Sequence, residues 1–302
     1  MKNSLFDPDL IFIKEDDLCV QSKIDDFLEH FIGNIKNIQN FCKTKIYWTD
    51  EIENLIWKNS YYSTNPDISN KFIPFYYNFQ SYFEILPNLP NHFCIANQSL
   101  LSSNTDVNNI FLKLVHYVKN TGEDILFCLG INNKGIESIS FNCSCCKSVL
   151  TPQLIKSPDD WFNYIDCIND YWPSNKEEFD EKFRKALEIY RRRNKYGNFL
   201  YNFNFTNEFI KNILDLKEGE VRIKMDITER ISQRLSLEEK IAERSRLRDE
   251  NVEGRKKNKK ERRFYTNIHK RVHYKYGNDG SISFLNYGNH DFGLRRSQQQ
   301  FR

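Results

Sequence analysis

Side chains suited to proton transfer and to phosphate binding lie close together near the end of the sequence. Polar and apolar residues alternate over residues 270–276, so a β-strand there would send Arg271 and His273 to one face. Val272 and Tyr274 would lie on the opposite, apolar face. Histidine titrates near neutral pH, and the arginine guanidinium binds phosphate through parallel hydrogen bonds. Such a face could transfer protons and stabilise negative charge at a phosphate.

A further histidine follows the next predicted strand. Gly277–Gly280 has the glycines and the Asn and Asp residues of a tight hairpin turn, and residues 281–287 would return as the neighbouring strand. This strand leads into His290, and neighbouring strands lie ~4.8 Å apart, so we expect His290 near Arg271. The simpler alternatives are a hydrogen-bonded structural histidine and an arginine in a surface salt bridge.

A dense basic run precedes these strands at residues 254–263. It supplies six candidate nucleic-acid ligands, which are Lys256, Lys257, Lys259, Lys260, Arg262 and Arg263. A solvated loop is the simpler interpretation of such a run. The charge distribution favours a polyanionic partner, because residues 201–302 contain 23 basic and 15 acidic side chains, a net +8, whereas residues 1–200 contain 21 and 26, a net −5.

The last third of the sequence has an ordered set of elements and short motifs. From Phe199 it reads as a strand, two helices, the basic run and a β-meander. The meander carries the motifs Arg262-Arg263-Phe264, Arg271-Val272-His273-Tyr274, Asp279-Gly280-Ser281-Ile282 and Asn286-Tyr287-Gly288-Asn289-His290-Asp291. In order and spacing, residues 199–302 resemble the RelE/ParE superfamily of bacterial toxins.

This resemblance implies a small RelE-like α+β domain at residues 198–302, with two helices on an antiparallel sheet. RelE-like members cleave messenger RNA, usually on the ribosome and without a metal, whereas ParE-like members act on gyrase. Arg271 matches the family's arginine on the central strand, and His290 falls where several ribonucleases of the family place a catalytic histidine or arginine. His273 is a further catalytic candidate. The tyrosine often found near the family's terminus has no match after Asp291, so the full catalytic set is not carried over.

The first part of the chain predicts a separate α/β domain, which gives an α+β protein overall. Residues 10–13 and 125–129 are strand-like apolar runs, and residues 24–35 and 107–118 have apolar side chains at helical spacing. The chain of 302 residues is long enough for two domains. Gly197 marks a break after a helical segment, so we expect a domain of unknown function at residues 1–197.

The cysteines give a weaker signal. Cys143, Cys145 and Cys146 lie close together with Cys128 upstream, as zinc ligands often do. No second short pair of ligands and no matching histidine spacing accompanies them. We therefore expect structural cysteines, no metal and no cofactor.

Carboxylates also lie near predicted strand ends. Asp7, Asp9, Asp50 and Glu51 are placed as in a metal-dependent nuclease, although helix caps and turns use the same residues. The sequence has neither a phosphate-binding glycine loop nor a nucleophile elbow.

These observations predict a toxin-like, metal-independent endoribonuclease that acts on mRNA at the ribosome. Its partners would be RNA or the ribosome and an antitoxin or regulatory protein. No apolar run reaches the ~18 residues of a membrane span and the N-terminus lacks a signal-peptide pattern, so we expect a cytoplasmic protein without membrane contact. The alternatives are a non-catalytic nucleic-acid-binding or interaction protein with a RelE-like fold, and an antiviral defence protein whose N-terminal domain is the enzyme.

Overall fold

The computed structural model divides the chain into two compact units, Met1–Tyr164 and Ile165–Arg302. It describes residues 2–289 except 43, 59–60, 87–88, 90, 92–93, 98–104, 122–123, 144–146, 148, 246, 248, 252–260 and 267–269. The fold is mixed, with a parallel sheet in the first unit and a separate, mostly antiparallel sheet in the second.

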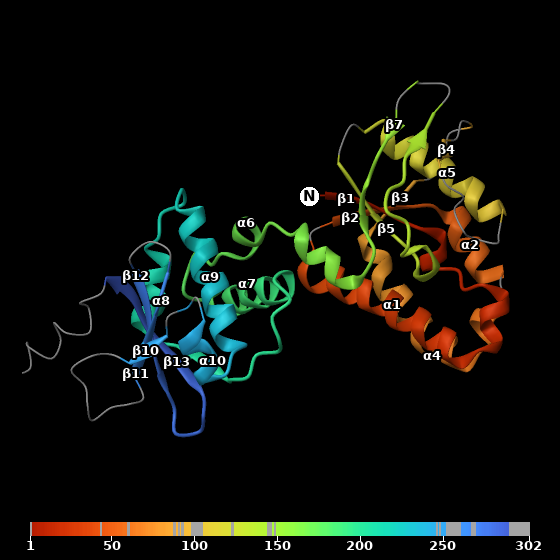
Figure 1. Ribbon diagram of the computed structural model, residues 1–302. Coiled ribbons are helices and arrows are strands. Elements are labelled where there is room, and N and C mark those ends of the chain that lie inside the picture. Colours follow the sequence, from red (N-terminus) through yellow and green to blue (C-terminus); the bar gives the residue numbers. More distant parts are fainter. Residues whose placement is uncertain are drawn as a thin grey trace, which may run out of the picture. The chain divides into compact units, whose positions relative to one another are not determined.

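The N-terminal unit is built on a parallel sheet with the strand order β3-β2-β1-β5-β8 (Figure 1). Its strands are β1 (Lys2–Phe6), β2 (Thr44–Trp48), β3 (Phe83–Ile85), β5 (Ile125–Cys128) and β8 (Gln153–Ile155). The chain builds outward from β1 to β3 and then crosses to β5 and β8. The order therefore reverses between β1 and β5, and in open α/β sheets this switch point is where ligands usually bind.

Helices and short turns connect these strands. The α-helices are α1 (Gln21–Phe41), α2 (Asp50–Lys58), α3 (Tyr61–Thr64), α4 (Pro66–Phe79) and α5 (Thr105–Lys119). The 3₁₀ turns are η1 (Pro8–Leu10), η2 (Glu15–Cys19), η3 (Gln80–Tyr82), η4 (Ile131–Asn133) and η5 (Pro158–Asn163). A small antiparallel sheet joins β4 (Ile95–Ala96), β6 (Phe141–Asn142) and β7 (Val149–Leu150).

The predicted helices and the strand at 125–129 are confirmed, but the strand at residues 10–13 is wrong. The first strand is β1, and the apolar run follows it as buried turn and coil. Asp7 follows β1 and caps the turn η1, which Pro8 opens. Strand β1 has no apolar pattern that would predict it, because some of its buried residues are polar. Ser4 is one of them, and its hydroxyl forms a hydrogen bond of 2.6 Å with the hydroxyl of Thr44.

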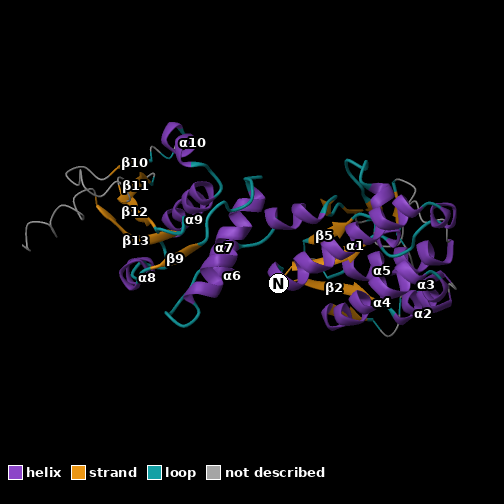
Figure 2. Cartoon of the chain, turned by 90° about the horizontal axis from the view of Figure 1, so that it is seen from below, coloured by secondary structure: helices purple, strands orange, loops and turns teal. Residues whose placement is uncertain are grey.

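The C-terminal unit places helices against a five-stranded sheet with the order β10-β11-β12-β13-β9 (Figure 2). Its strands are β9 (Phe203–Phe205), β10 (Glu250–Asn251), β11 (Glu261–Tyr265), β12 (Lys270–Tyr276) and β13 (Ile282–Asn289). Its helices are α6 (Cys167–Tyr171), α7 (Phe179–Arg193), α8 (Asn207–Leu214), α9 (Val221–Leu235) and α10 (Glu239–Arg244). The meander β10 to β13 is antiparallel, while β9 pairs in parallel with β13.

The boundary between the units lies earlier than the predicted position at Gly197. Helix α7 belongs to the C-terminal unit, because Phe179, Phe183 and Leu187 pack in its core. The hydroxyl of Ser232 in α9 also donates to the carbonyl of Leu187 at 2.8 Å. The helical segment before Gly197 is therefore part of the core of the C-terminal unit. The glycine marks a local break in the chain and does not indicate in which core the preceding helix packs.

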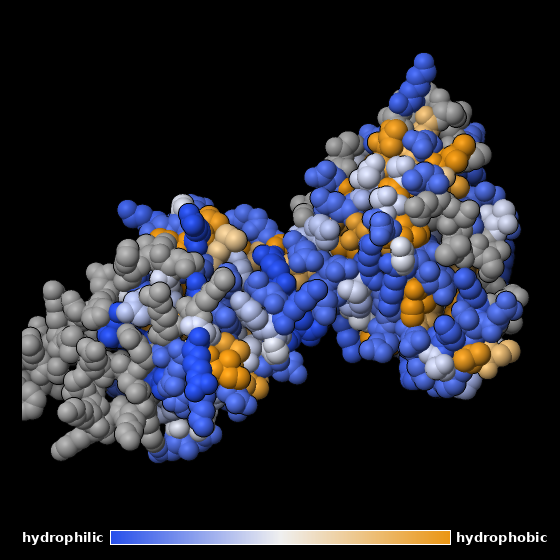
Figure 3. Space-filling model, viewed as in Figure 1, coloured by the Kyte–Doolittle hydropathy of each residue, from blue (hydrophilic) through white to orange (hydrophobic). Residues whose placement is uncertain are grey.

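Apolar side chains form one buried cluster in each unit. In Figure 3, hydrophilic residues cover most of the described surface in view, and apolar residues form small separate patches. Among the described residues, none of the helices combines the length and the apolar character needed to cross a membrane.

Candidate functional site

Four polar side chains lie together on β11 and β12, and we call them the polar sheet face: Arg263, Tyr265, Arg271 and His273. The antiparallel register pairs Arg263 with His273 and Tyr265 with Arg271. Directly opposed residues of antiparallel strands have Cβ atoms ~5 Å apart, so the four side chains are immediate neighbours. The predicted alternation is confirmed, since Val272 and Tyr274 join the apolar core.

Three residues of the polar sheet face, Arg263, Arg271 and His273, are buried, and Tyr265 is half-buried. Arg271 exposes 3% of its surface, Arg263 also 3% and His273 6%. The Arg271 guanidinium lies 3.9 Å from the centre of the Tyr265 ring and donates a hydrogen bond to the Tyr265 hydroxyl. Arg271 thus lies along the neighbouring strand instead of extending into solvent, and stacking on an aromatic ring is favourable for a guanidinium.

Arg262, predicted to bind nucleic acid, is instead held by three carboxylates. Its side chain is buried on the helix side of β11. It contacts Asp249 at 3.3 Å, Glu243 at 2.7 Å and also Glu239. The charge and the donors of this guanidinium are engaged by carboxylates, which argues against a role for Arg262 in binding an RNA phosphate. The sequence did not indicate these ion pairs, because the three carboxylates lie before the basic run and not within it.

Asp249 also binds Arg234, and together with Arg262 these residues form a buried charged network. The carboxylate of Asp249 lies 2.9 Å from Nε of Arg234 and accepts a hydrogen bond of 2.6 Å from the Tyr274 hydroxyl. Burial raises the pKa of Tyr274, and it raises the pKa of Tyr276 to about 12, so both hydroxyls stay protonated at neutral pH. Sequence reasoning missed this network, although Arg234 lies three residues after Ile231, on the apolar stripe of α9.

The remaining predicted ligands of the C-terminal unit fall outside the described residues. These are His290, Lys256, Lys257, Lys259 and Lys260. Their roles stay predictions from the sequence.

Asp7 and Asp9 lie at the switch point of the parallel sheet, where β1 and β5 end. Asp7 accepts hydrogen bonds from the Gly130 amide at 3.0 Å and from the Asn133 side chain, and Asp9 accepts from the amide and side chain of Asn132 at 2.8 and 2.9 Å. Burial raises the pKa of Asp7, and it raises the pKa of Asp9 to about 6. The carboxylates thereby join the loop after β1 to the loop after β5.

Gly130 permits this close approach. A Cβ atom at position 130 would lie 2.3 Å from the carbonyl carbon of Asp9, a distance that no side chain tolerates. A cavity of about 110 Å³ is lined in part by Lys23, Asp26 and Asn132, and Asn132 is the residue that hydrogen-bonds Asp9.

Asp50 and Glu51, the other two carboxylates considered, are exposed at the first turn of α2. Acidic side chains there stabilise the positive end of the helix dipole. This interaction with the helix dipole accounts for both residues.

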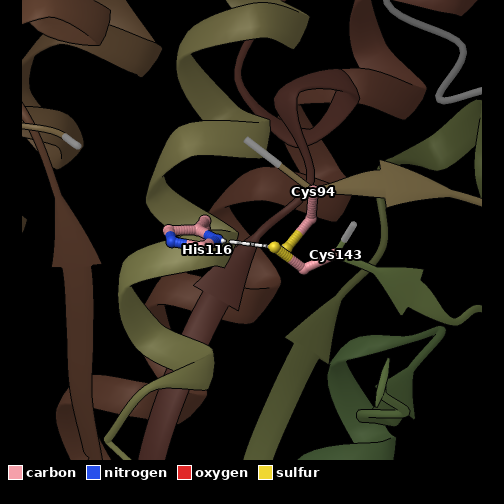
Figure 4. Close-up of side chains that lie close together, drawn as sticks. All are labelled: Cys94, His116 and Cys143. Atoms are coloured by element: carbon pink, nitrogen blue, oxygen red, sulfur yellow. Dashed lines mark hydrogen bonds between the residues drawn. The ribbon is translucent and has the colours of Figure 1, made fainter. Parts of the chain in front are cut away.

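Two cysteines and a histidine of the N-terminal unit meet in the fold (Figure 4). The ligand atoms of Cys94, His116 and Cys143 all lie within 4.8 Å of one another, and the three residues are buried. This is a histidine partner for Cys143 that the sequence spacing did not reveal, because it lies 27 residues away.

Comparisons with family models, with curated proteins and with solved structures give no match to this chain.

Proposed function

We propose that the C-terminal unit is a metal-independent endoribonuclease that cleaves messenger RNA, with the polar sheet face as its catalytic surface. The observation that supports this proposal is the register of β11 and β12, which brings two arginines, a histidine and a tyrosine together. The net charge of +8 over residues 201–302 favours a polyanionic substrate. The enzyme would act as a toxin on ribosome-bound mRNA, and an antitoxin or regulatory protein would restrain it.

The four side chains fit the steps of RNA cleavage by the 2′-hydroxyl. The 2′-oxygen attacks the phosphorus and loses its proton to a base, while the 5′-oxygen leaves and takes up a proton from an acid. We assign the base to His273 and the acid to Tyr265, which touches Arg271. Arg263 and Arg271 would stabilise the negative charge that develops on the phosphate. The products are a 2′,3′-cyclic phosphate and a 5′-hydroxyl.

The burial of these groups sets a condition on the reaction. His273 exposes 6% of its surface and the two arginines 3% each, so the proposal requires that binding to RNA or to the ribosome make these side chains accessible to the phosphate. Cleavage should therefore be measured on ribosomes carrying mRNA as well as on naked RNA.

The test is cleavage by the full chain and by three conservative variants. His273→Gln removes the imidazole, Arg271→Lys removes the planar guanidinium and Tyr265→Phe removes only a hydroxyl. Loss of a proton-transfer group costs roughly 10²- to 10⁴-fold in rate, so we expect His273→Gln to abolish detectable cleavage. Lys275→Gln is the matched control, because Lys275 lies on the same strand but is exposed.

The ends of the RNA fragments and the melting temperature complete the test. We expect cyclic phosphate ends from the parent and a cooperative melting transition, as evidence of folding, from all three variants. Full activity of a folded His273→Gln or Arg271→Lys variant contradicts the proposal. Intact RNA with the parent protein, on and off the ribosome, favours a nucleic-acid-binding module instead.

A further inference from the structure

We propose that Cys94, His116 and Cys143 bind one Zn²⁺ in the N-terminal unit. The site is independent of the proposed ribonuclease activity, because all three residues belong to the first unit. Two thiolates and one imidazole are three of the four ligands of the Cys₃His and Cys₂His₂ zinc sites of proteins.

The distances between the ligand atoms fit a metal at their centre. Nδ1 of His116 lies 3.2 Å from Sγ of Cys143 and 3.9 Å from Sγ of Cys94. With Zn–N of ~2.05 Å and Zn–S of ~2.3 Å, tetrahedral coordination requires an N···S separation of ~3.6 Å. The two observed distances bracket this value, so a zinc ion fits between the three atoms with small side-chain adjustments.

Two elements of the fold bring the cysteines together. Strands β4 and β6 pair antiparallel, with Ala96 opposite Phe141 and Ile95 opposite Asn142. One step further along this register, Cys94 lies opposite Cys143. Directly opposed residues in antiparallel strands have Cα atoms ~4.5–5.5 Å apart, which lets both thiolates reach one ion.

Helix α5 supplies the histidine from the side. The amide of Cys94 donates a hydrogen bond of 3.3 Å to the carbonyl of Leu112. Leu112 lies one helical turn before His116, so this bond sets Cys94 beside the part of α5 that carries the imidazole. In Figure 4 the His116 ring points from the helix toward the two sulfur atoms.

The small sheet of β4, β6 and β7 explains what the metal would do. Each of its strands is two residues long, and so few backbone hydrogen bonds give little stability by themselves. A zinc ion would join β4, β6 and α5 at one point and fix the sheet to the helix. We therefore infer a structural role for the metal. Cys145 and Cys146 lie outside the described residues, and the proposal rests on the three described ligands.

The test is metal analysis of the full chain purified without chelators. We expect about one zinc per chain, and a strong reduction in bound zinc for Cys94→Ser, Cys143→Ser and His116→Gln. Cys128→Ser is the matched control, because Cys128 is a buried free cysteine of the same unit whose thiol bonds Asn34. This control should keep its zinc.

Two measurements on the parent chain avoid the problem of variants that do not fold. A strong chelator should release the zinc and lower the melting temperature of the N-terminal unit. Replacement of zinc by Co²⁺ should give the visible absorption of tetrahedral cobalt with thiolate ligands. A metal-free parent with unchanged melting in chelator overturns the proposal, and so does a disulfide between Cys94 and Cys143 in the protein purified from cells.

Discussion

Replacement of Asp249 by asparagine should destabilise the C-terminal unit more than any surface substitution. Asp249 and Arg234 have fully buried side chains with N and O atoms 2.9 Å apart. Asparagine keeps the shape but removes the charge, so the guanidinium of Arg234 is left beside the Tyr274 hydroxyl and the Leu237 carbonyl. Removal of one partner of a buried ion pair costs roughly 3–5 kcal/mol.

Arg262, the second arginine of the network, should add little to this loss in the free energy of unfolding. Arg262 keeps Glu239 and Glu243, whose side chains are 50% and 44% exposed. We therefore take the estimate from Arg234 alone. For a unit of this size, about 3–5 kcal/mol lowers the melting temperature by roughly 10–20 °C.

Differential scanning calorimetry of the full chain measures this change. The C-terminal transition should move and the N-terminal transition should stay. Asp215→Asn is the control, because it is the same substitution at an exposed position of the same unit and should cost less than ~0.5 kcal/mol. A C-terminal transition within ~2 °C of the parent would show that the Asp249 charge does not hold this unit together.

Two further predictions concern charged groups, Asp9 in the N-terminal unit and the basic run in the C-terminal unit. The carboxyl of Asp9 has a pKa of about 6 in the folded protein and of 3.8 in the unfolded chain. Between these two pH values the folded state therefore binds more protons than the unfolded state, and the free energy of unfolding falls as the pH rises from about 4 to about 6. Denaturant unfolding of the N-terminal unit should therefore give a lower free energy at pH 7 than at pH 5, and Asp9→Asn should flatten this dependence; a steeper loss of stability toward acid in the parent contradicts the assignment. Neutralising the basic run should weaken RNA or ribosome binding and reduce the salt dependence of this binding, while leaving the melting temperature unchanged. If the affinity falls with salt concentration as steeply as in the parent, the basic run does not bind the phosphates. The four substituted residues are Lys256, Lys257, Lys259 and Lys260.

Local patterns in the sequence predicted the elements whose burial follows a simple period. The helical spacing at residues 24–35 and 107–118 corresponds to α1 and α5, and the apolar run at 125–129 to β5. Strand β1 escaped this reasoning because its buried positions include Asn3 and Ser4. A buried strand that contains polar residues lacks the continuous apolar run on which the prediction of strands depends.

The candidate sites show a second limit, which is distance along the chain. The alternation on β12 correctly grouped Arg271 with His273, because neighbours on one strand are set by the backbone alone. The carboxylates that hold Arg262 come from other elements, 13 to 23 residues earlier. His116 lies 22 residues after Cys94 and 27 before Cys143. Only the tertiary fold reveals such partners.

The parallel pairing of β9 with β13 has a consequence for synthesis of the protein. Strand β13 lies between β12 and β9 but is the last of the five to leave the ribosome. Until then, β12 and β9 lack the strand that lies between them, and the position next to the β9 edge of the sheet is empty. Until β13 is synthesised, the nascent unit therefore exposes two unpaired strand edges, which favours aggregation or chaperone binding over early folding.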